Sequence, residues 1–290
     1  MPREPVVILG GGPAGLTAAI ELIKRGIRPI VVEKADKVGG MARTEMFRGY
    51  HFDMGGHRFF TRYERVQQLW EEMLPSDFIR VSRLSRIYFN GRFFNYPIGF
   101  FNAFSNLGFI ESVMILASYF KAQLMPHRDE RTFEQWVTNR FGLRLHRTFF
   151  KAYTEKVWGM PCHKIQADWA AQRIKSLSLM TALSNALFGK QGVRSLINEF
   201  RYPQKGSGMM WQRFKEVIED GGGEVRLNSQ VVGLKHKDGF IESITTSDGS
   251  APLEIRTGNV LSSMPVSELL GLLEPPIPDE IREAVRKLTY

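Results

Sequence analysis

The chain is poor in cysteine: among its 290 residues, Cys162 is the only one that carries a thiol. A single cysteine excludes an internal disulfide, and cysteine-poor chains are typical of reducing compartments. We therefore expect a cytoplasmic protein. Cys162 precedes His163, but the sequence offers neither the partners of a nucleophile nor the ligand spacing of a metal centre. We accordingly expect no metal and no cysteine catalysis.

Long apolar runs are missing as well. The most apolar extended segment covers residues 107–125, where Glu111 and Lys121 interrupt it. A bilayer span needs about 20 largely apolar residues, so this segment predicts a buried helix, with a helix lying on a membrane surface as the alternative. At the N-terminus a strand pattern begins at Val6, so we expect no signal peptide.

Negative charge is scarce relative to positive charge. The chain has 30 Asp and Glu against 39 Lys and Arg, a net charge of +9. Such an excess indicates an anionic ligand, an acidic membrane surface or nucleic acid. No recognised nucleic-acid-binding module accompanies the charge, so nucleic acid is not an expected partner. Most of the basic residues would lie on solvated faces, and the rest would bind an anionic small molecule or contact a lipid surface.

Glycine, in contrast, occurs at an informative spacing. An apolar run at residues 6–9 leads directly into Gly10, Gly12 and Gly15, a helical pattern follows, and a second apolar run ends at Glu33. This βαβ context predicts a dinucleotide-binding turn. Gly10 would permit the turn, Gly12 the close approach of a pyrophosphate, and Gly15 the packing of helix on strand. The helix N-terminus would attract the phosphates, and Glu33 would accept hydrogen bonds from ribose hydroxyls.

The pattern of the chain changes twice along its length. After the βαβ unit come glycine-rich loops and a hairpin at Asn90-Gly91, where both turn residues favour positive φ. From about residue 100 to residue 187 the pattern is mainly helical. A further helix is expected over residues 207–220, followed over residues 224–262 by short strands typical of a β-meander joined to a larger sheet, and then by a last helix. This order predicts a discontinuous nucleotide-binding domain that a helical domain interrupts.

Three further segments carry a resemblance to a known family. The first contains Gly39, Gly40 and Arg43, the second is Asp53-Met54-Gly55-Gly56-His57, and the third runs from Tyr153 to Arg173. With the glycine-rich turn, the first two resemble the FAD-binding start of the amine oxidase, protoporphyrinogen oxidase and phytoene desaturase superfamily. The Gly-Gly-His-x-Phe pattern and the Lys-Val-Trp…Pro…Trp…Arg pattern of the third segment are most similar to UDP-galactopyranose mutases.

The resemblance implies a fold. It would be α/β, with a Rossmann-like FAD-binding domain (GR2-type) and a mostly helical inserted domain on the substrate side. The FAD-binding domain would occupy residues 1–98 and, with the β-meander, residues 199–290, and the insertion would occupy residues 99–198. Family members are usually longer and carry a C-terminal segment that closes the flavin pocket, so the chain resembles a C-terminally truncated member.

The resemblance also implies FAD as the cofactor and assigns residues to it. These residues come from the three glycine-rich segments and the acid that ends the βαβ unit. They are Gly10, Gly12, Pro13, Ala14, Gly15, Glu33, Lys34, Gly39, Gly40, Met41, Ala42, Arg43, Gly55, Gly56 and His57.

Catalysis by the flavin is the functional expectation. The first hypothesis is a UDP-galactopyranose mutase-like enzyme that acts on a nucleotide sugar such as a UDP-sugar, with N5 of the reduced flavin as the nucleophile. The alternative is an FAD-dependent oxidoreductase of the amine oxidase, protoporphyrinogen oxidase or desaturase type, in which hydride passes from substrate to flavin. A second alternative is a truncated FAD-binding fragment without catalysis. The sequence leaves the oligomeric state open.

Four residues are candidates for the reaction itself. His57 would shape the flavin face or stabilise charge there. Arg173 would bind the substrate diphosphate, since a guanidinium suits bidentate contact with phosphate. Trp158 and Trp169 would line the substrate pocket, or else belong to the core of the helical domain.

Overall fold

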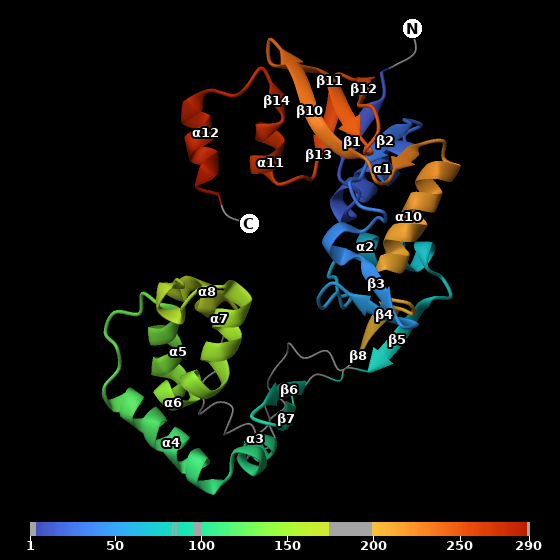
Figure 1. Ribbon diagram of the computed structural model, residues 1–290. Helices are drawn as coiled ribbons and strands as arrows, with labels where there is room; N and C mark the ends of the chain where they lie inside the picture. Colours follow the sequence, from blue (N-terminus) through green and yellow to red (C-terminus); the bar gives the residue numbers. More distant parts are fainter. Residues whose placement is uncertain (1–3, 83, 85, 96–99, 174–198, 289–290) are drawn as a thin grey trace. The chain divides into compact units, whose positions relative to one another are not determined.

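The computed structural model describes residues 4–82, 84, 86–95, 100–173 and 199–288. It divides the chain into two compact units, residues 1–82 with 199–290 and residues 83–198 (Figure 1). The first boundary lies before the expected residue 98, because the hairpin at 86–95 belongs to the second unit. There the backbone N–H of Asn95 donates to Asn102 at 2.7 Å, and the amide of Asn106 donates to the Phe93 carbonyl at 3.1 Å.

A four-stranded parallel sheet with the strand order β13-β1-β2-β9 belongs to the first unit. Its strands are β13 (Asn259–Ser262), β1 (Val6–Leu9), β2 (Pro29–Val32) and β9 (Glu224–Arg226). Helix α1 (Pro13–Ile23) connects β1 to β2. The expected βαβ unit is therefore present, and β1 and β2 read as nearly continuous apolar runs because parallel strands are covered on both faces.

A second sheet has the order β12-β11-β10-β14. It consists of β12 (Leu253–Arg256), β11 (Phe240–Ser247), β10 (Gln230–Lys237) and β14 (Leu273–Glu274). The first three pair antiparallel, as a meander does, and β14 joins β10 in parallel. The expected meander is confirmed for β10, β11 and β12. The first and last strands of the predicted series, β9 and β13, pair with the parallel sheet, which is the larger sheet to which the meander was expected to be joined.

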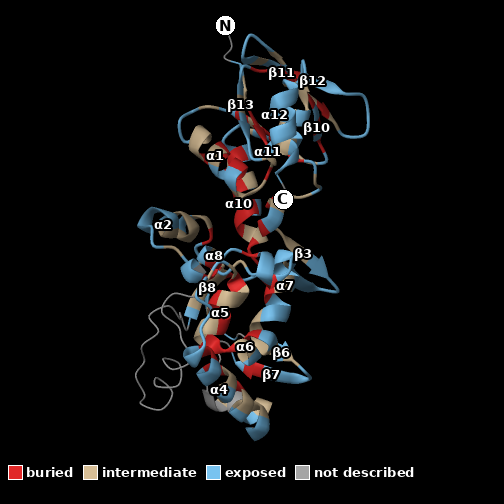
Figure 2. Ribbon diagram, turned by 90° about the vertical axis from the view of Figure 1, so that its left-hand side faces the viewer, coloured by how far each residue is buried: buried red, intermediate tan, exposed pale blue. Residues whose placement is uncertain are grey.

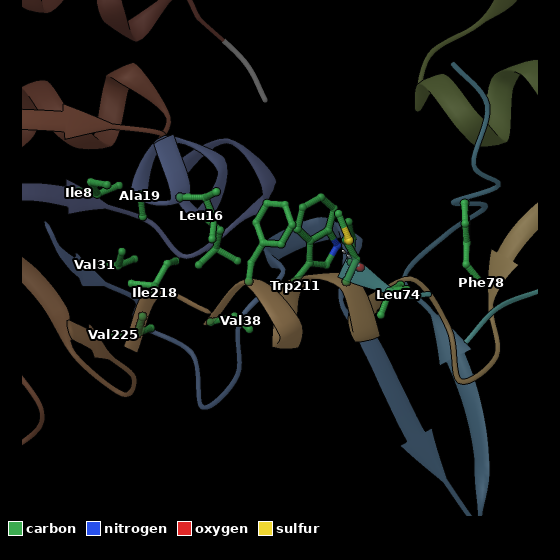
Figure 3. Packing of buried hydrophobic residues seen from close by; sticks show 14 residues of the cluster. Ile8, Leu16, Ala19, Val31, Val38, Leu74, Phe78, Trp211, Ile218 and Val225 are labelled. Carbon is green, nitrogen blue, oxygen red and sulfur yellow. Dashed lines mark hydrogen bonds between the residues drawn. The ribbon is translucent and has the colours of Figure 1, made fainter. Parts of the chain in front are cut away.

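The parallel sheet lies between two layers of apolar contacts. Successive side chains of a strand point to opposite faces, so Ile8 packs with α1 and α10 (Gly208–Asp220), whereas Val7 and Leu9 pack with the second sheet. Figure 3 shows the first layer, in which Leu16 and Ile218 lie between the strands and the Trp211 ring. Packing on both faces of β1 therefore positions the turn that joins β1 to α1.

Strands from the two sequence halves also pair within this unit. They include β5 (Phe78–Ser82), antiparallel to β8 (Glu199–Pro203), and next to them β3 (Thr44–Phe47) forms a hairpin with β4 (Tyr50–Asp53). Helix α2 (Glu64–Met73) places Trp70 against Phe78, with ring centroids 5.5 Å apart, and against Trp211 at 5.9 Å. The unit ends with α11 (Val266–Gly271) and α12 (Asp279–Arg286).

In its described residues, the second unit contains the hairpin and a group of helices. The hairpin strands are β6 (Arg86–Phe89) and β7 (Arg92–Asn95), joined by Asn90 and Gly91 at positive φ as predicted. The helical elements are α3 (Phe100–Leu107), α4 (Phe109–Leu124), α5 (Phe133–Phe141), α6 (Leu143–Leu145), the π-helical η2 (His146–Lys151), α7 (Ala152–Trp158), the 3-10 turn η3 (Cys162–Lys164) and α8 (Ala167–Arg173).

The core of the second unit is built on α5. A Thr132 capping box with Gln135 starts this helix. Its residues Phe133 and Val137 are buried against Cys162 of η3 and other members of the core, and Figure 2 shows buried positions along α5. Helix α4 was expected to be buried, but only Ile115, Tyr119 and Ala122 are buried along it. Among the described residues, no helix combines the length and the apolar content that a bilayer span requires.

Candidate functional site

The β1–α1 turn places the three glycines as the pattern predicts. Gly10 has φ +107°, and its N–H donates to the Val32 carbonyl at 2.8 Å. A Cβ on Gly15 would lie 2.0 Å from the Gly10 carbonyl oxygen, so this position tolerates no side chain. A Cβ on Gly12 would meet only the Gly40 Cα, at 3.8 Å. Two of the glycines are therefore required by the fold, whereas the fold leaves space at Gly12.

The start of α1 presents backbone donors next to that space. Pro13 occupies the first turn, and no side chain caps Gly12 at this helix end. Ala14 and Gly15 follow in the same turn, and the first intrahelical bond joins the Leu16 N–H to the Gly12 carbonyl at 3.0 Å. An uncapped helix N-terminus combines free N–H groups with a partial positive charge, which together favour a phosphate.

Glu33 is buried at the end of β2 and already binds backbone. One carboxylate oxygen accepts the Gly11 N–H at 2.7 Å, and the other accepts the Ala35 N–H at 2.9 Å. These contacts fix the orientation of the carboxylate. Each oxygen keeps a further lone pair for another donor, so a contact with ribose stays a prediction that the geometry permits. Lys34, the next residue, is exposed.

The second glycine pair lies directly against the first loop. Gly39 and Gly40 have φ +108° and +51°, and Gly40 begins the 3-10 turn η1 (Gly40–Ala42). The Gly39 N–H donates to the Gly11 carbonyl at 2.8 Å, and a Cβ on Gly40 would lie 3.2 Å from the Gly12 Cα. Met41, the residue after Gly40, is 84% exposed, while Ala42 is buried. The structure therefore brings these two predicted segments together.

Arg43 is less available than the sequence suggests. Its Nε donates to Glu45 at 2.6 Å, and Lys37 donates to the same carboxylate at 2.5 Å. Hydrogen bonds from Lys37 and Arg43 lower the pKa of Glu45 below its ordinary value. Arg43, which lies beside the glycine loop, is thus already engaged by a carboxylate that it shares with Lys37.

A polar network that the sequence did not reveal supports this loop. Asp53, at the end of β4, accepts from the Thr44 hydroxyl at 2.5 Å, from the Ser207 N–H at 3.0 Å and from the Tyr202 hydroxyl. The Ala42 carbonyl accepts from the Ser207 hydroxyl at 2.8 Å and from the Trp211 indole at 3.1 Å. Apart from the Thr44–Asp53 bond, the partners are more than 140 residues apart in the chain, so no local pattern could predict these contacts.

Gly206 and Gly208 make this network possible. A Cβ on Gly206 would lie 2.4 Å from the Thr44 hydroxyl oxygen, and one on Gly208 would lie 2.7 Å from the Thr44 nitrogen. Gly206 also has φ +96°. The only signal in the sequence was the Gly-Ser-Gly run itself, which marks a close backbone approach without naming its partner.

His57 follows a loop in which Gly55 has φ +105° and Gly56 is exposed. The imidazole is half-buried, and its Nδ1 is buried without a hydrogen-bond partner among the described residues. Buried polar atoms usually have partners, so this nitrogen is a candidate to bind a group from outside the chain.

The remaining candidates belong to the second unit. Trp158 on α7 and Trp169 on α8 contact each other edge to face, with centroids 4.7 Å apart. Trp158 is 40% exposed, whereas Trp169 packs on Phe133 at the core, and a role of either ring in a substrate pocket stays a prediction. Arg173 is the last residue of α8, and its side chain lies outside the described part of the structure.

Two further side chains of this unit are buried. No sequence pattern singled out His146, and Cys162 was expected to have no catalytic role. His146 is fully buried, and neither ring nitrogen has a partner among the described residues. Burial lowers its pKa, against the nearby charges of Glu134 and Glu155. Cys162 is likewise fully buried, and burial raises the pKa of its thiol to about 11. A thiol of this kind is a poor nucleophile, in line with its expected lack of a catalytic role.

Comparison with known proteins identifies the class. The model of the flavin containing amine oxidoreductase family matches residues 13–290. The chain therefore belongs to this family, and its cofactor is FAD, as the glycine segments predicted.

Relatives and solved structures place the chain within a broad group of flavoproteins. It is 26% identical over 271 residues to the 15-cis-phytoene desaturase of Solanum lycopersicum, covering 86% of this chain and 45% of that protein. It is 25% identical over 278 residues to the 1-hydroxycarotenoid 3,4-desaturase of Flavobacterium sp. (strain P99-3), covering 87% and 55%. The chain thus spans about half the length of the curated relatives that it matches.

Among solved structures, a reduced UDP-galactopyranose mutase superposes with a TM-score of 0.77 at 23% identity, over 99% of this chain and 62% of that one. A putative protoporphyrinogen oxidase from Exiguobacterium sp. 255-15 superposes with a TM-score of 0.64 at 19% identity, over 100% and 64%. At these identities the structural likeness shows a shared fold.

The first unit fits the cofactor. The open side of Gly12, the uncapped start of α1 and the fixed Glu33 carboxylate suit a dinucleotide. The unpartnered Nδ1 of His57 suits a polar group that the protein itself does not supply.

Proposed function

We propose that the first unit binds FAD through the turns at Gly10–Gly15 and Gly39–Arg43. The observation that supports this most strongly is the space beside Gly12, which the fold leaves open although it closes the positions around Gly10 and Gly15. The N–H groups at the start of α1 would donate to the pyrophosphate, and Glu33 would accept from a ribose hydroxyl. When bound, FAD supplies a flavin that can attack an anomeric carbon or accept a hydride.

We further propose that the parent activity is that of a UDP-galactopyranose mutase-like enzyme acting on a nucleotide sugar. The pattern from Tyr153 to Arg173 and the superposition on the mutase over 99% of the chain support this choice. Charge supports it too. Residues 83–198 hold 16 Lys and Arg but 6 Asp and Glu, a net charge of +10 against −1 for the first unit. A cationic unit attracts a nucleoside diphosphate.

Individual residues receive roles in this proposal. Arg173 would bind the diphosphate, since a guanidinium donates two parallel hydrogen bonds to phosphate oxygens. Trp158 would contribute its exposed face to the uridine or sugar, while Trp169 holds it in place from the core. His57 would donate to or accept from the flavin through its unpartnered nitrogen.

The second candidate is an FAD-dependent oxidoreductase that takes a hydride from its substrate. The desaturase relatives, which cover 86% and 87% of the chain, favour it. In this case exposed apolar side chains of the second unit, such as Val157 and Trp158, would contact the substrate, and its cations would not determine which substrate binds.

One experiment separates the two. The FAD-loaded protein is reduced without oxygen, supplied with UDP-galactopyranose, and the products are separated by chromatography. Ring-contracted UDP-sugar without net oxidation of the flavin supports the mutase. Absence of that product from the full natural protein, together with flavin reduction by an unsaturated lipid or an amine, supports the oxidoreductase.

A further inference from the structure

Helix α4 presents a stripe of apolar side chains to the outside. Ile110, Val113, Phe120 and Leu124 are 73%, 47%, 54% and 84% exposed, and Ala117 between them is exposed as well. Their three- and four-residue spacing places all five on one face of the helix. Met125, just past the end of α4, extends the stripe and is 74% exposed.

The opposite face of α4 is already packed, so the stripe cannot turn inward. Tyr119 and Ala122 are buried there, and a Cβ on Gly142 would lie 2.7 Å from the Tyr119 nitrogen. Arg144 anchors the same side, where its guanidinium donates twice to the Glu111 carboxylate at 2.8 and 2.7 Å. The unit therefore holds the apolar face in a fixed outward orientation.

Cations accompany the stripe. Near α4, the carboxylates of Glu111, Asp129 and Glu130 each form an ion pair with an arginine of the same unit, which removes their charge from the local balance. Several exposed basic side chains have no ion pair within the described parts of the chain. Lys121, at the edge of the stripe, and Arg128, just past the end of α4, are the two closest to it in sequence; Arg147, Lys151, Lys156 and Lys164 lie on other elements of the same unit.

We propose that α4 docks the second unit on an anionic lipid surface. The stripe would enter the boundary between headgroups and acyl chains, and Lys121 and Arg128 would contact lipid phosphates. An amphipathic helix lies in the plane of a membrane in this way, and 16 residues extend about 24 Å along it. A second copy of the chain fits the stripe less well, because it would bring one unit of charge +10 against another.

Sedimentation with vesicles tests the proposal. The 290-residue chain is mixed with vesicles of phosphatidylcholine alone or with about one-third phosphatidylglycerol. We expect binding at least about tenfold stronger to the anionic vesicles, and weaker as salt rises, since salt screens the cations. Equal binding to both vesicles, or binding to neither, would overturn the proposal.

Matched variants place the contact. Lys121→Glu with Leu124→Ser removes a cation and a leucine from the stripe, and we expect at least tenfold weaker binding, since each change alone is worth about fivefold or more. The control, Lys237→Glu with Phe240→Ser, makes the same kind of change at an exposed lysine and an exposed aromatic residue of the first unit. It should bind as the unchanged chain does.

Further measurements separate loss of lipid binding from misfolding and from a change of oligomeric state. Circular dichroism and denaturant unfolding show whether each variant folds, and FAD titration shows whether the first unit keeps its proposed cofactor site. Light scattering without vesicles reports mass. Suppose that the unchanged chain is a dimer that does not bind anionic vesicles, and that the stripe variant is a monomer. The stripe is then an interface between copies, and the lipid proposal is wrong.

Discussion

The Tyr202 hydroxyl donates a hydrogen bond to the Asp53 carboxylate across 149 residues of sequence. Burial and the neighbouring Asp53 raise the pKa of Tyr202 above its ordinary value, so the phenol stays protonated and remains a donor. Asp53 also holds Thr44 and Ser207, and the Ser207 hydroxyl holds the Ala42 carbonyl at the end of the second glycine loop. The loop at Gly39–Arg43 is therefore positioned by strands from both halves of the unit.

Replacing Asp53 by Ala should lower the free energy of unfolding by about 3 kcal/mol, because it leaves the Thr44, Ser207 and Tyr202 donors without an acceptor. The FAD affinity should fall as well, since the loop loses its support. Tyr202→Phe removes a single bond and should cost about 1 kcal/mol. Denaturant unfolding and FAD titration measure both effects. Asp248→Ala, in an exposed turn where Asp248 binds Ser250, is the control and should leave FAD binding unchanged.

How far the sequence predicts this fold depends on how local each interaction is. The βαβ unit and the Asn90-Gly91 hairpin follow from periodicity and turn chemistry, which act within about ten residues. The assignment of β9 and β13 to the parallel sheet could not be predicted, because a short apolar strand carries no information about its partner. The leading expectation that α4 is buried was wrong for a related reason: apolar content indicates burial, but only the packed structure shows which face of a helix is covered.

The candidate site divides in the same way. The glycine positions are readable because each requires a specific backbone conformation or close approach, as the contacts of Gly10 and Gly15 show. The bonds of Asp53 with Ser207 and of the Ala42 carbonyl with Trp211 depend on residues that only folding brings together. The roles of Arg173 and Trp158 came from a resemblance and stay predictions.

Replacing Arg173 by Ala should weaken UDP binding about tenfold or more, because the diphosphate loses a charged bidentate donor. Titration calorimetry with UDP measures the change. Lys164→Ala removes an exposed cation from the same unit and serves as the control for charge alone. An unchanged affinity in the Arg173 variant would remove this residue from the proposed site.

The stability of the second unit should fall in acid because of His146. Burial lowers its folded-state pKa below the ordinary value of 6.5, so the unfolded chain binds a proton more readily than the folded one. The contribution of the neutral imidazole is complete above the unfolded pKa and is lost as the pH falls from there towards the folded pKa. Unfolding in denaturant between about pH 8 and pH 5 reveals this slope.

A pair of histidine variants assigns the slope to that residue. His146→Gln removes the titrating group and should flatten the dependence on pH in this window, even though the variant is less stable at every pH. His163→Gln changes an exposed histidine of the same unit and should keep the slope. If both variants retain it, another group is responsible.

The central claim is that the space beside Gly12 receives the FAD pyrophosphate, and Gly12→Ala tests it most directly. The new Cβ meets only the Gly40 Cα at 3.8 Å, so the folded chain should keep its stability. FAD affinity, measured by flavin fluorescence quenching, should fall at least about tenfold because the methyl group occupies the phosphate position, and Gly12→Val should abolish binding. Gly271→Ala, also in open space, is the control. Undiminished FAD binding by a folded Gly12→Ala protein would contradict the account.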